Sequence, residues 1–218
     1  MNGVMPQPCR RPEWFVLIVL AGLLAVPASV AQAGPEDAGA FLDALNKTAI
    51  ETLNDTAISE DQRLQEFRKL AQKSFDVPRI SKFVLGINWR RATPAQREEF
   101  LDVFEDVNLQ RFMPLFTKYA DQVFTVTKVR QHKEKPRLYF VTSTISREEA
   151  PTATVEWRVA KRDDEYRILD VIAEGVSMAL TLRKEYGSVV KNLGIDGLIA
   201  QLREKVKSED RAANSTPQ

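Results

Sequence analysis

The amino-acid sequence predicts an α+β fold, in which helices precede and follow a curved antiparallel sheet of about four strands. Apolar residues recur every three or four positions from residue 36 to residue 119, and again after residue 177. Between residues 123 and 173 the period changes, and Val, Thr, Ile, Tyr and Trp gather in short segments. Only short polar turns separate these segments, which favours antiparallel pairing of neighbouring strands.

The first two helices are expected over residues 36–55 and after Ser59. Residues 36–55 carry one apolar stripe. Ser59 and Gln62 form a capping-box pattern, in which each side chain satisfies a free backbone N–H of the first turn. Phe67 and Leu70 give the second helix its apolar side.

Two more helices are expected before the sheet. Asp76 and the early Pro78 indicate the start of a short helix that ends at Gly86. Thr93 begins a long helix rich in phenylalanine. Pro114 lies within this helix and is expected to kink or split it, because proline lacks the backbone N–H.

The strands are expected over residues 123–130, 137–146, 152–162 and 166–173. Alternate side chains of a strand share a face, so each strand has two sets. One set of the second strand contains Tyr139, Val141, Ser143 and Ile145, and one set of the third contains Val155, Trp157 and Val159. At least one face of the sheet is therefore strongly apolar.

Two helices are expected at the end of the chain, over residues 177–193 and 196–207. Residues 208–218 are polar and are predicted to be a flexible tail. Residues 34–207 contain no internal repeat or low-complexity linker and are predicted to be one domain.

Residues 1–33 have the three-part pattern of a secretory signal peptide. Arg10 and Arg11 are followed by the apolar run Trp14–Val26, and the segment ends in Ala31-Gln32-Ala33. The run of 13 residues is shorter than the roughly 20 that span a bilayer. The alternative is an uncleaved membrane anchor. The pattern predicts export to the periplasm, and the two arginines leave open whether the Sec or the twin-arginine route is used.

Charge and cysteine content exclude several classes of protein. Without residues 1–33 the basic and acidic residues balance, so no long-range attraction to nucleic acid is expected. The only cysteine, Cys9, precedes the apolar run, which excludes disulfides from the exported domain and argues against lipidation. His132 is the only histidine and falls in a polar turn, so neither a metal site nor a cofactor is expected.

The search for catalytic groups leaves one candidate pair. There is no nucleophile-elbow pattern and no phosphate-binding glycine-rich loop. Asp170 or Glu174 inside a cone-shaped sheet would suit a small isomerase or hydrolase, which is kept as a weaker alternative. The expectation is that the protein is not an enzyme.

Several short runs, in order, resemble the MlaC family of periplasmic lipid-binding proteins, also called toluene-tolerance auxiliary proteins. The runs are Phe75-Asp76-Val77-Pro78, Val84-Leu85-Gly86, Trp89-Arg90, Gln96-Arg97-Glu98-Glu99-Phe100, Asp170-Val171, Glu174-Gly175-Val176-Ser177 and Gly194-Ile195-Asp196-Gly197-Leu198-Ile199. The resemblance extends over roughly residues 36–207. The run Glu174–Ala179, with Thr181, Arg183 and Glu185, looks closest to the hopanoid-associated HpnM branch.

The resemblance implies a function and partners. Such proteins carry phospholipid, or hopanoid in the HpnM branch, between the outer membrane and an inner-membrane ABC transporter, and so maintain outer-membrane lipid asymmetry. Their fold leaves a deep apolar pocket for acyl chains between helices and sheet. Each buried CH₂ is worth about 0.8 kcal/mol, so a lipid with about 30 of them needs an apolar wall to cross water. The implied partners are the lipid, the transporter complex and an outer-membrane lipoprotein complex.

The resemblance also directs the choice of site residues. The residues expected to contact lipid are Phe83, Val84, Phe104, Phe112, Tyr139, Val141, Ile145, Val155, Trp157, Val159, Val176 and Met178. Arg90, Arg91 and Arg183 are the candidates for pairing with a head-group phosphate. The alternative to a carrier is an adaptor that docks to an ABC transporter without enclosing a ligand.

Overall fold

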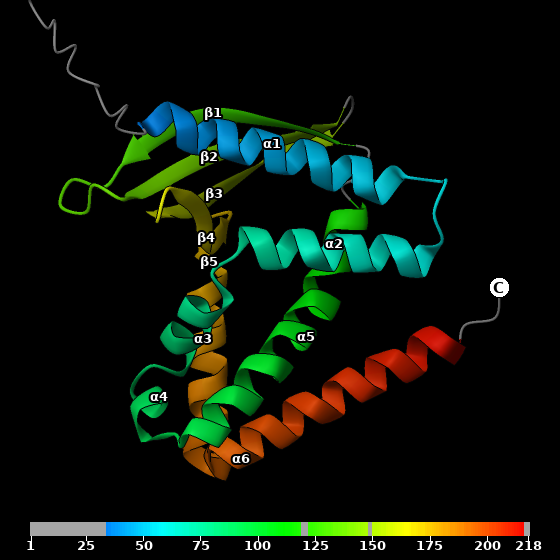
Figure 1. The fold of residues 1–218 in the computed structure, drawn as a ribbon, viewed down its shortest axis with the longest axis vertical. Helices are drawn as coiled ribbons and strands as arrows, with labels where there is room; N and C mark the ends of the chain where they lie inside the picture. Colours follow the sequence, from blue (N-terminus) through cyan, green and yellow to red (C-terminus); the bar gives the residue numbers. More distant parts are fainter. Residues whose placement is uncertain (1–33, 119–121, 148–149, 216–218) are drawn as a thin grey trace, which may run out of the picture. The chain divides into compact units, whose positions relative to one another are not determined.

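A computed structural model describes residues 34–118, 122–147 and 150–215. The signal peptide expected over residues 1–33 lies outside the described residues. In the described part, helices α1 to α5 precede the sheet and helix α6 follows it (Figure 1). None of the described helices combines the length and the apolar character that a membrane crossing requires.

The helices before the sheet are α1 (Pro35–Asn54), α2 (Glu60–Ser74), α3 (Val77–Leu85), α4 (Ile87–Arg91) and α5 (Pro94–Lys118). Three of them begin where the capping residues Ser59, Asp76 and Thr93 predict, whereas the short helix α4 was not expected. The Ser59 hydroxyl accepts the N–H of Gln62 at 3.2 Å, and the Gln62 side chain accepts the N–H of Ser59 at 3.0 Å, which confirms the capping box of α2. Thr93 and Gln96 exchange the same two bonds at the start of α5.

Gly86 separates α3 from α4. Its φ of 57° lies in the region that only glycine adopts freely, so the chain turns here between the two short helices. Pro114 was expected to kink or split the next helix. It does not split it, because α5 continues through this position to Lys118.

The sheet is an antiparallel meander in sequence order, as predicted. Its strands are β1 (Val123–Gln131), β2 (Leu138–Arg147), β3 (Ala150–Arg162), β4 (Glu165–Ala173) and β5 (Val176–Ser177). The two-residue β5 was not expected. Asp163 and Asp164 both have positive φ, at 47° and 64°, which is the backbone of the tight hairpin turn between β3 and β4.

One face of the sheet is buried, and its residues alternate as predicted. Tyr139, Val141, Ser143 and Ile145 of β2 are all buried, and so are Val155, Trp157 and Val159 of β3. The one polar residue of β2 in this set is accounted for, because the Ser143 hydroxyl accepts the indole N–H of Trp157 at 2.9 Å.

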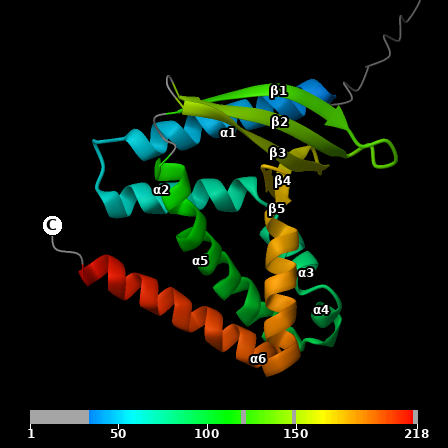
Figure 2. The same ribbon diagram turned by 180° about the vertical axis from the view of Figure 1, so that it is seen from behind.

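Helix α6 (Met178–Ser215) consists of two helical arms joined at Gly194 (Figures 1 and 2). Gly194 has a φ of 73°, which breaks the helical backbone at one residue. The two arms correspond to the two C-terminal helices that the sequence predicted. The second arm reaches Ser215, so residues 208–215 are helical where polar composition predicted a flexible tail.

Two apolar cores hold the described residues together. The sheet core joins α1 to the buried sheet face through Leu42, Tyr139, Val159 and Ile168. The helical core joins α3, α5 and the two arms of α6, and it includes Phe100, Tyr186 and Leu198. Aromatic edges meet in the helical core, where the rings of Phe100 and Tyr186 lie 6.2 Å apart at 88°.

Candidate functional site

A cavity of about 320 Å³ lies between the sheet core and the helical core. Of its 26 lining residues, 21 are apolar, so a molecule inside it is surrounded mainly by hydrocarbon. The volume falls within the roughly 300–1,000 Å³ typical of ligand pockets. The lining draws on α1, α2, α3, α5, the start of α6 and strands β1 to β4.

Helix α1 belongs to the sheet core at one end and to the cavity wall at the other. Ala38 and Leu42, which are fully buried, pack on the sheet, whereas Leu45 and Ala49 face the cavity. All four lie on one helical stripe, spaced by four, three and four residues. A single amphipathic pattern in the sequence thus produces both solid packing and a cavity wall.

Helices α2 and α5 form the opposite wall. Phe67, Leu70 and Ala71 of α2 face the cavity, and so do Phe104 and Phe112 of α5. From the sheet come Phe124, Ile145, Val155, Trp157, Leu169, Val171 and Ala173. These strand residues lie at one end of the buried face, away from Tyr139 and Val159.

Small side chains explain why the space stays open. Ala49, Ala71, Ala173 and Ala179 come from four different elements and all line the cavity. An alanine reaches no further than its Cβ, so helices held apart by the larger neighbouring residues leave a void at these positions. Protein interiors otherwise pack at the density of organic crystals. A void of this size therefore either holds another molecule or lowers the stability of the folded protein.

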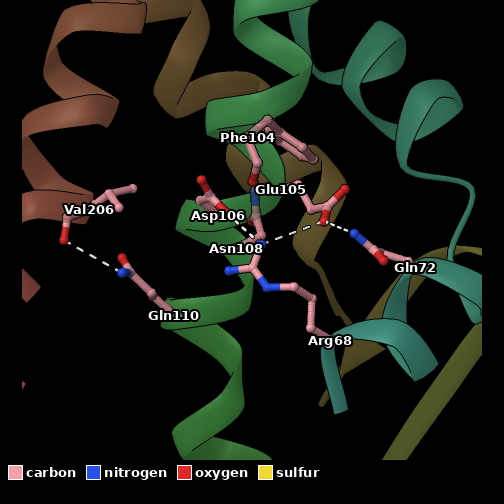
Figure 3. Close-up of polar contacts among 8 residues, drawn as sticks. All are labelled: Arg68, Gln72, Phe104, Glu105, Asp106, Asn108, Gln110 and Val206. Carbon is pink, nitrogen blue, oxygen red and sulfur yellow. Dashed lines mark hydrogen bonds and ion pairs between the residues drawn. The ribbon is translucent and has the colours of Figure 1, made fainter. Parts of the chain in front are cut away.

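Polar contacts between α2 and α5 form a rim beside the apolar lining (Figure 3). The Arg68 guanidinium contacts the Asp106 carboxylate at 2.6 Å and the Glu105 carboxylate at 3.8 Å. The Gln72 amide donates to the same Glu105 carboxylate. Arg68 and Gln72 are exposed and Glu105 and Asp106 are half-buried, while Gln72 and Glu105 also belong to the lining, so this cluster marks where the cavity wall meets solvent.

Two asparagines place uncharged polar groups in the wall. The Asn108 amide donates to the Phe104 carbonyl at 2.6 Å, as Figure 3 shows, but its buried Oδ1 has no partner in the described part of the chain. The buried Nδ2 of Asn46 lacks a partner among the same residues. An unpaired buried amide atom costs roughly 1–3 kcal/mol, so the Nδ2 of Asn46 favours an acceptor such as an ester oxygen, and the Oδ1 of Asn108 favours a donor such as a hydroxyl.

Asp170 is the most buried charged group of the lining, and it has a structural role. Its carboxylate accepts the Ser177 hydroxyl at 2.6 Å and the backbone N–H of Ala179 at 2.9 Å, and Arg158 lies 3.7 Å away. It therefore caps the start of α6. Glu174, the other carboxylate considered for catalysis, is exposed and accepts the N–H of Thr154 at 2.8 Å.

Half of the twelve residues expected to contact lipid line the cavity. These are Phe104, Phe112, Ile145, Val155, Trp157 and Met178. Val84 is buried in the helical core, and Tyr139, Val141 and Val159 are buried in the sheet core. Phe83 and Val176 are exposed at the surface. Contact of any of the twelve with a lipid stays a prediction.

The three arginines expected to bind a head group lie outside the lining. Arg90 and Arg91 are exposed on α4. Arg183 donates from Nη1 to the Phe83 carbonyl at 3.0 Å and lies over the Phe83 ring, 4.9 Å from its centre. The lining contains no Lys, Arg or His among the described residues, and its charged groups are the paired carboxylates of Glu105 and Asp170.

Sequence reasoning missed the contribution of α1 and α2 to the site. Leu45, Ala49, Phe67, Leu70 and Ala71 all line the cavity. Their helical spacing was visible in the sequence and gave the correct faces. It did not indicate that these faces oppose a void, because filled and hollow cores share the same periodicity.

Fold and cavity together define a binding domain for an apolar molecule. The chain belongs to the MlaC family, whose model, described as MlaC protein, matches residues 43–204. The expected resemblance to this family is confirmed; the narrower assignment to the HpnM branch stays a prediction.

A curated relative is the intermembrane phospholipid transport system binding protein MlaC of Haemophilus influenzae. It is 24% identical over 126 residues, which make up 56% of this chain and 58% of that relative. The chain thus spans just over half the length of the curated relative it matches.

A solved structure shares the fold. It is a phospholipid-binding protein from Ralstonia solanacearum, determined in complex with a phospholipid. The TM-score is 0.68 at 20% sequence identity, and the match covers 79% of this chain and 98% of that one. The expected α+β class, a sheet packed by helices, is confirmed.

Proposed function

We propose that the protein is a periplasmic lipid carrier that holds the acyl chains of a phospholipid, or the apolar body of a hopanoid, in the cavity. The observation that carries the proposal is a cavity of about 320 Å³ with an apolar lining, in a chain of the MlaC family. Transfer of each CH₂ group from water to such a wall is favourable by about 0.8 kcal/mol, so burial of part of one acyl chain suffices for tight binding.

The head group is expected to stay at or beyond the polar rim. A phosphate requires cations or N–H donors, and the charged groups of the described lining are the carboxylates of Glu105 and Asp170. Arg68 is the cation of the rim, where it pairs with Asp106. The unpaired Nδ2 of Asn46 can donate to an ester oxygen that joins a chain to the head group, and the unpaired Oδ1 of Asn108 can accept from a lipid hydroxyl.

The proposed route runs between the outer membrane and an ABC transporter of the inner membrane. The Haemophilus influenzae relative is named as the binding protein of an intermembrane phospholipid transport system, which supports this route. The signal-like residues 1–33 support a periplasmic location. Carriage needs no catalytic group, and the carboxylates of Asp170 and Glu174 are used in capping and backbone hydrogen bonds.

Lipid extraction tests the proposal. Protein purified without detergent is extracted with organic solvent, and the extract is analysed by mass spectrometry for phospholipid and hopanoid. We expect about one lipid per chain, as one cavity of this size implies. Protein that is empty, and that takes up neither phospholipid from phosphatidylethanolamine–phosphatidylglycerol vesicles nor added diplopterol, would favour the adaptor alternative.

A cavity-filling variant places the lipid. Ala71→Phe projects a ring from α2 into the space, and we expect the lipid retained to fall ~10-fold, equivalent to about 1.4 kcal/mol. Ala95→Phe adds the same group on an exposed position of α5 and should retain lipid normally. Ala49→Leu fills the same space from α1. This second variant keeps the test valid if Ala71→Phe fails to fold. Normal retention by both filling variants, with unchanged circular dichroism, would exclude the cavity as the lipid site.

A further inference from the structure

A surface on the outer side of α3, α4 and α6 combines exposed cations with exposed apolar side chains. The cations are Arg79, Lys82, Arg90 and Arg91, all of them exposed. The apolar residues are Phe83, Ile87 and Leu180, with exposed fractions of 37%, 51% and 46%. These seven residues are called the basic apolar patch.

Contacts bring the patch together across the three helices. Arg183 of α6 donates to the Phe83 carbonyl at 3.0 Å and stacks on the Phe83 ring. Its guanidinium also lies against Gly86, which directly precedes Ile87; a Cβ at Gly86 would come within 2.9 Å of it. Leu180 lies three residues before Arg183 and so shares its side of α6. Figures 1 and 2 show α3, α4 and the first arm of α6 side by side.

The charged residues of the patch are all basic, and they form no ion pairs among the described residues. Residues 77–92 contain no Asp or Glu. None of the four cations forms an ion pair within the described part of the chain, although Arg68, Arg111 and Arg203 elsewhere do. The nearest acid in sequence, Asp76, caps α3 by accepting the N–H of Arg79.

We propose that the basic apolar patch docks the protein on a membrane surface that contains anionic lipid. Long flexible cations gain from anionic head groups without fixed partners, and separate Phe, Ile and Leu side chains enter the head-group region beside them. At a protein–protein interface, by contrast, the apolar anchors cluster at the centre and are seated in fitted pockets of the partner.

The helices that carry the patch also form part of the cavity wall, so docking through the patch brings the cavity close to the membrane. Val77 and Ile80 of α3, and Ala179 and Leu182 of α6, line the cavity from the inner sides of the helices whose outer sides carry the patch. A protein docked through the patch therefore holds one wall of the cavity next to the bilayer. The inference concerns the surface and holds whatever molecule the cavity contains.

Vesicle co-flotation tests the proposal. The probes are vesicles of phosphatidylglycerol with phosphatidylethanolamine and, as the neutral reference, vesicles of phosphatidylcholine. We expect the purified protein to float with the anionic vesicles only, and the bound fraction to fall when salt is raised from 50 to 500 mM, because screening weakens exposed charge interactions.

Matched variants separate the patch from overall charge. The variant R79Q/K82Q/R90Q/R91Q should lose binding about 100-fold, and Phe83→Ser with Leu180→Ser should weaken it about 10-fold. The control K128Q/K133Q/K135Q/K207Q removes the same charge from exposed lysines elsewhere and should bind within about 2-fold of the parent. All are compared with an identical N-terminus, verified by intact mass, and with unchanged circular dichroism.

Three outcomes would overturn the proposal. The first is wild-type protein that does not bind anionic vesicles, which would assign the patch to an acidic protein surface. The second is a control that loses as much binding as the patch variant, which would make the attraction one of net charge. The third is a patch variant that binds as tightly as the wild type. Lipid content, measured on the same variants by mass spectrometry, is expected to be unchanged, so failure of docking is distinguishable from failure of the carrier function.

Discussion

The buried face of the sheet is solid at one end and hollow at the other. At the solid end Tyr139, Val159 and Ile168 are buried in one cluster with Ala38 and Leu42 from the first half of α1. At the hollow end Ile145, Val155 and Trp157 face the cavity, although the same strands supply them with the same alternation. The difference therefore arises in the elements that cover the sheet.

The covering helices differ in how closely they approach. At the solid end α1 presents Gly39, and a Cβ there would lie 3.0 Å from the Cγ2 of Val129, so helix and strand are in close contact. At the hollow end α2 and α5 present Ala71 and bulky phenylalanines, which hold the backbones apart. Close packing and a cavity are set by the size of a few side chains, with no change of pattern.

The largest expected effect is on stability at the solid end. Ile168→Ala should lower the unfolding free energy of the lipid-free protein by about 2–5 kcal/mol, because it creates a new void in a filled region. Ile145→Ala removes the same atoms at the hollow end and should cost only about 1 kcal/mol, since one side of that residue already lacks contacts. Urea unfolding measures both. Equal losses would mean that the two ends are packed alike.

A second test asks whether water is excluded from the helical core, which borders the cavity. Burial, and then the charge of Glu185, raise the pKa of Tyr186 from 10 to about 12. Below pH 10 the phenol keeps its proton in both folded and unfolded chains, so it contributes its full stability there. Between pH 10 and 12 the unfolded chain ionises first, and stability should fall by roughly 2.7 kcal/mol.

Tyr186→Phe should remove that alkaline loss. Stability at pH 7 should change by no more than about 1 kcal/mol, because the hydroxyl interacts with the Asn108 side chain but makes no hydrogen bond of good geometry among the described residues. Urea unfolding at pH 7, 10 and 11.5 measures the difference. An alkaline loss as large in the variant as in the wild type would show that Tyr186 does not cause it, and therefore that burial does not raise the pKa of its phenol.

The smallest expected effect concerns the contact between α1 and the sheet. Gly39→Ala should lower stability by about 1 kcal/mol, because the new methyl meets Val129, despite alanine's higher helix propensity. In a Val129→Ala background the same change should instead raise stability by up to about 1 kcal/mol. Thermal unfolding of the four proteins in this cycle gives the coupling. Identical effects in both backgrounds would place α1 further from the sheet than the structure has it.

Most of the fold could be predicted because its signals are local. Capping residues such as Ser59 and Thr93 fixed the helix starts, and strand alternation identified the buried face correctly. The two-residue β5 carried no periodicity, and the chain beyond Lys207 was too polar to show its helical state.

The site was less predictable, because a cavity is a relation between elements. Val141 and Val155 alternate identically, yet only Val155 reaches the void. Chemical type alone makes an arginine a candidate for phosphate binding, whereas the Arg183 guanidinium donates to the backbone carbonyl of Phe83 on α3. Which helix covers which end of the sheet depends on tertiary packing, which single-strand patterns do not encode.

The stripe along α1 has a consequence for local stability. Leu42 and its neighbours bury the first half of the helix against the sheet, whereas Leu45 and Ala49 of the second half border the cavity. The end of the helix is held by α2, where the Arg63 guanidinium donates to the Leu53 carbonyl at 3.3 Å. We expect the backbone amides of the first half to exchange with solvent more slowly than those of the second half, because fewer buried contacts protect the half that borders the cavity.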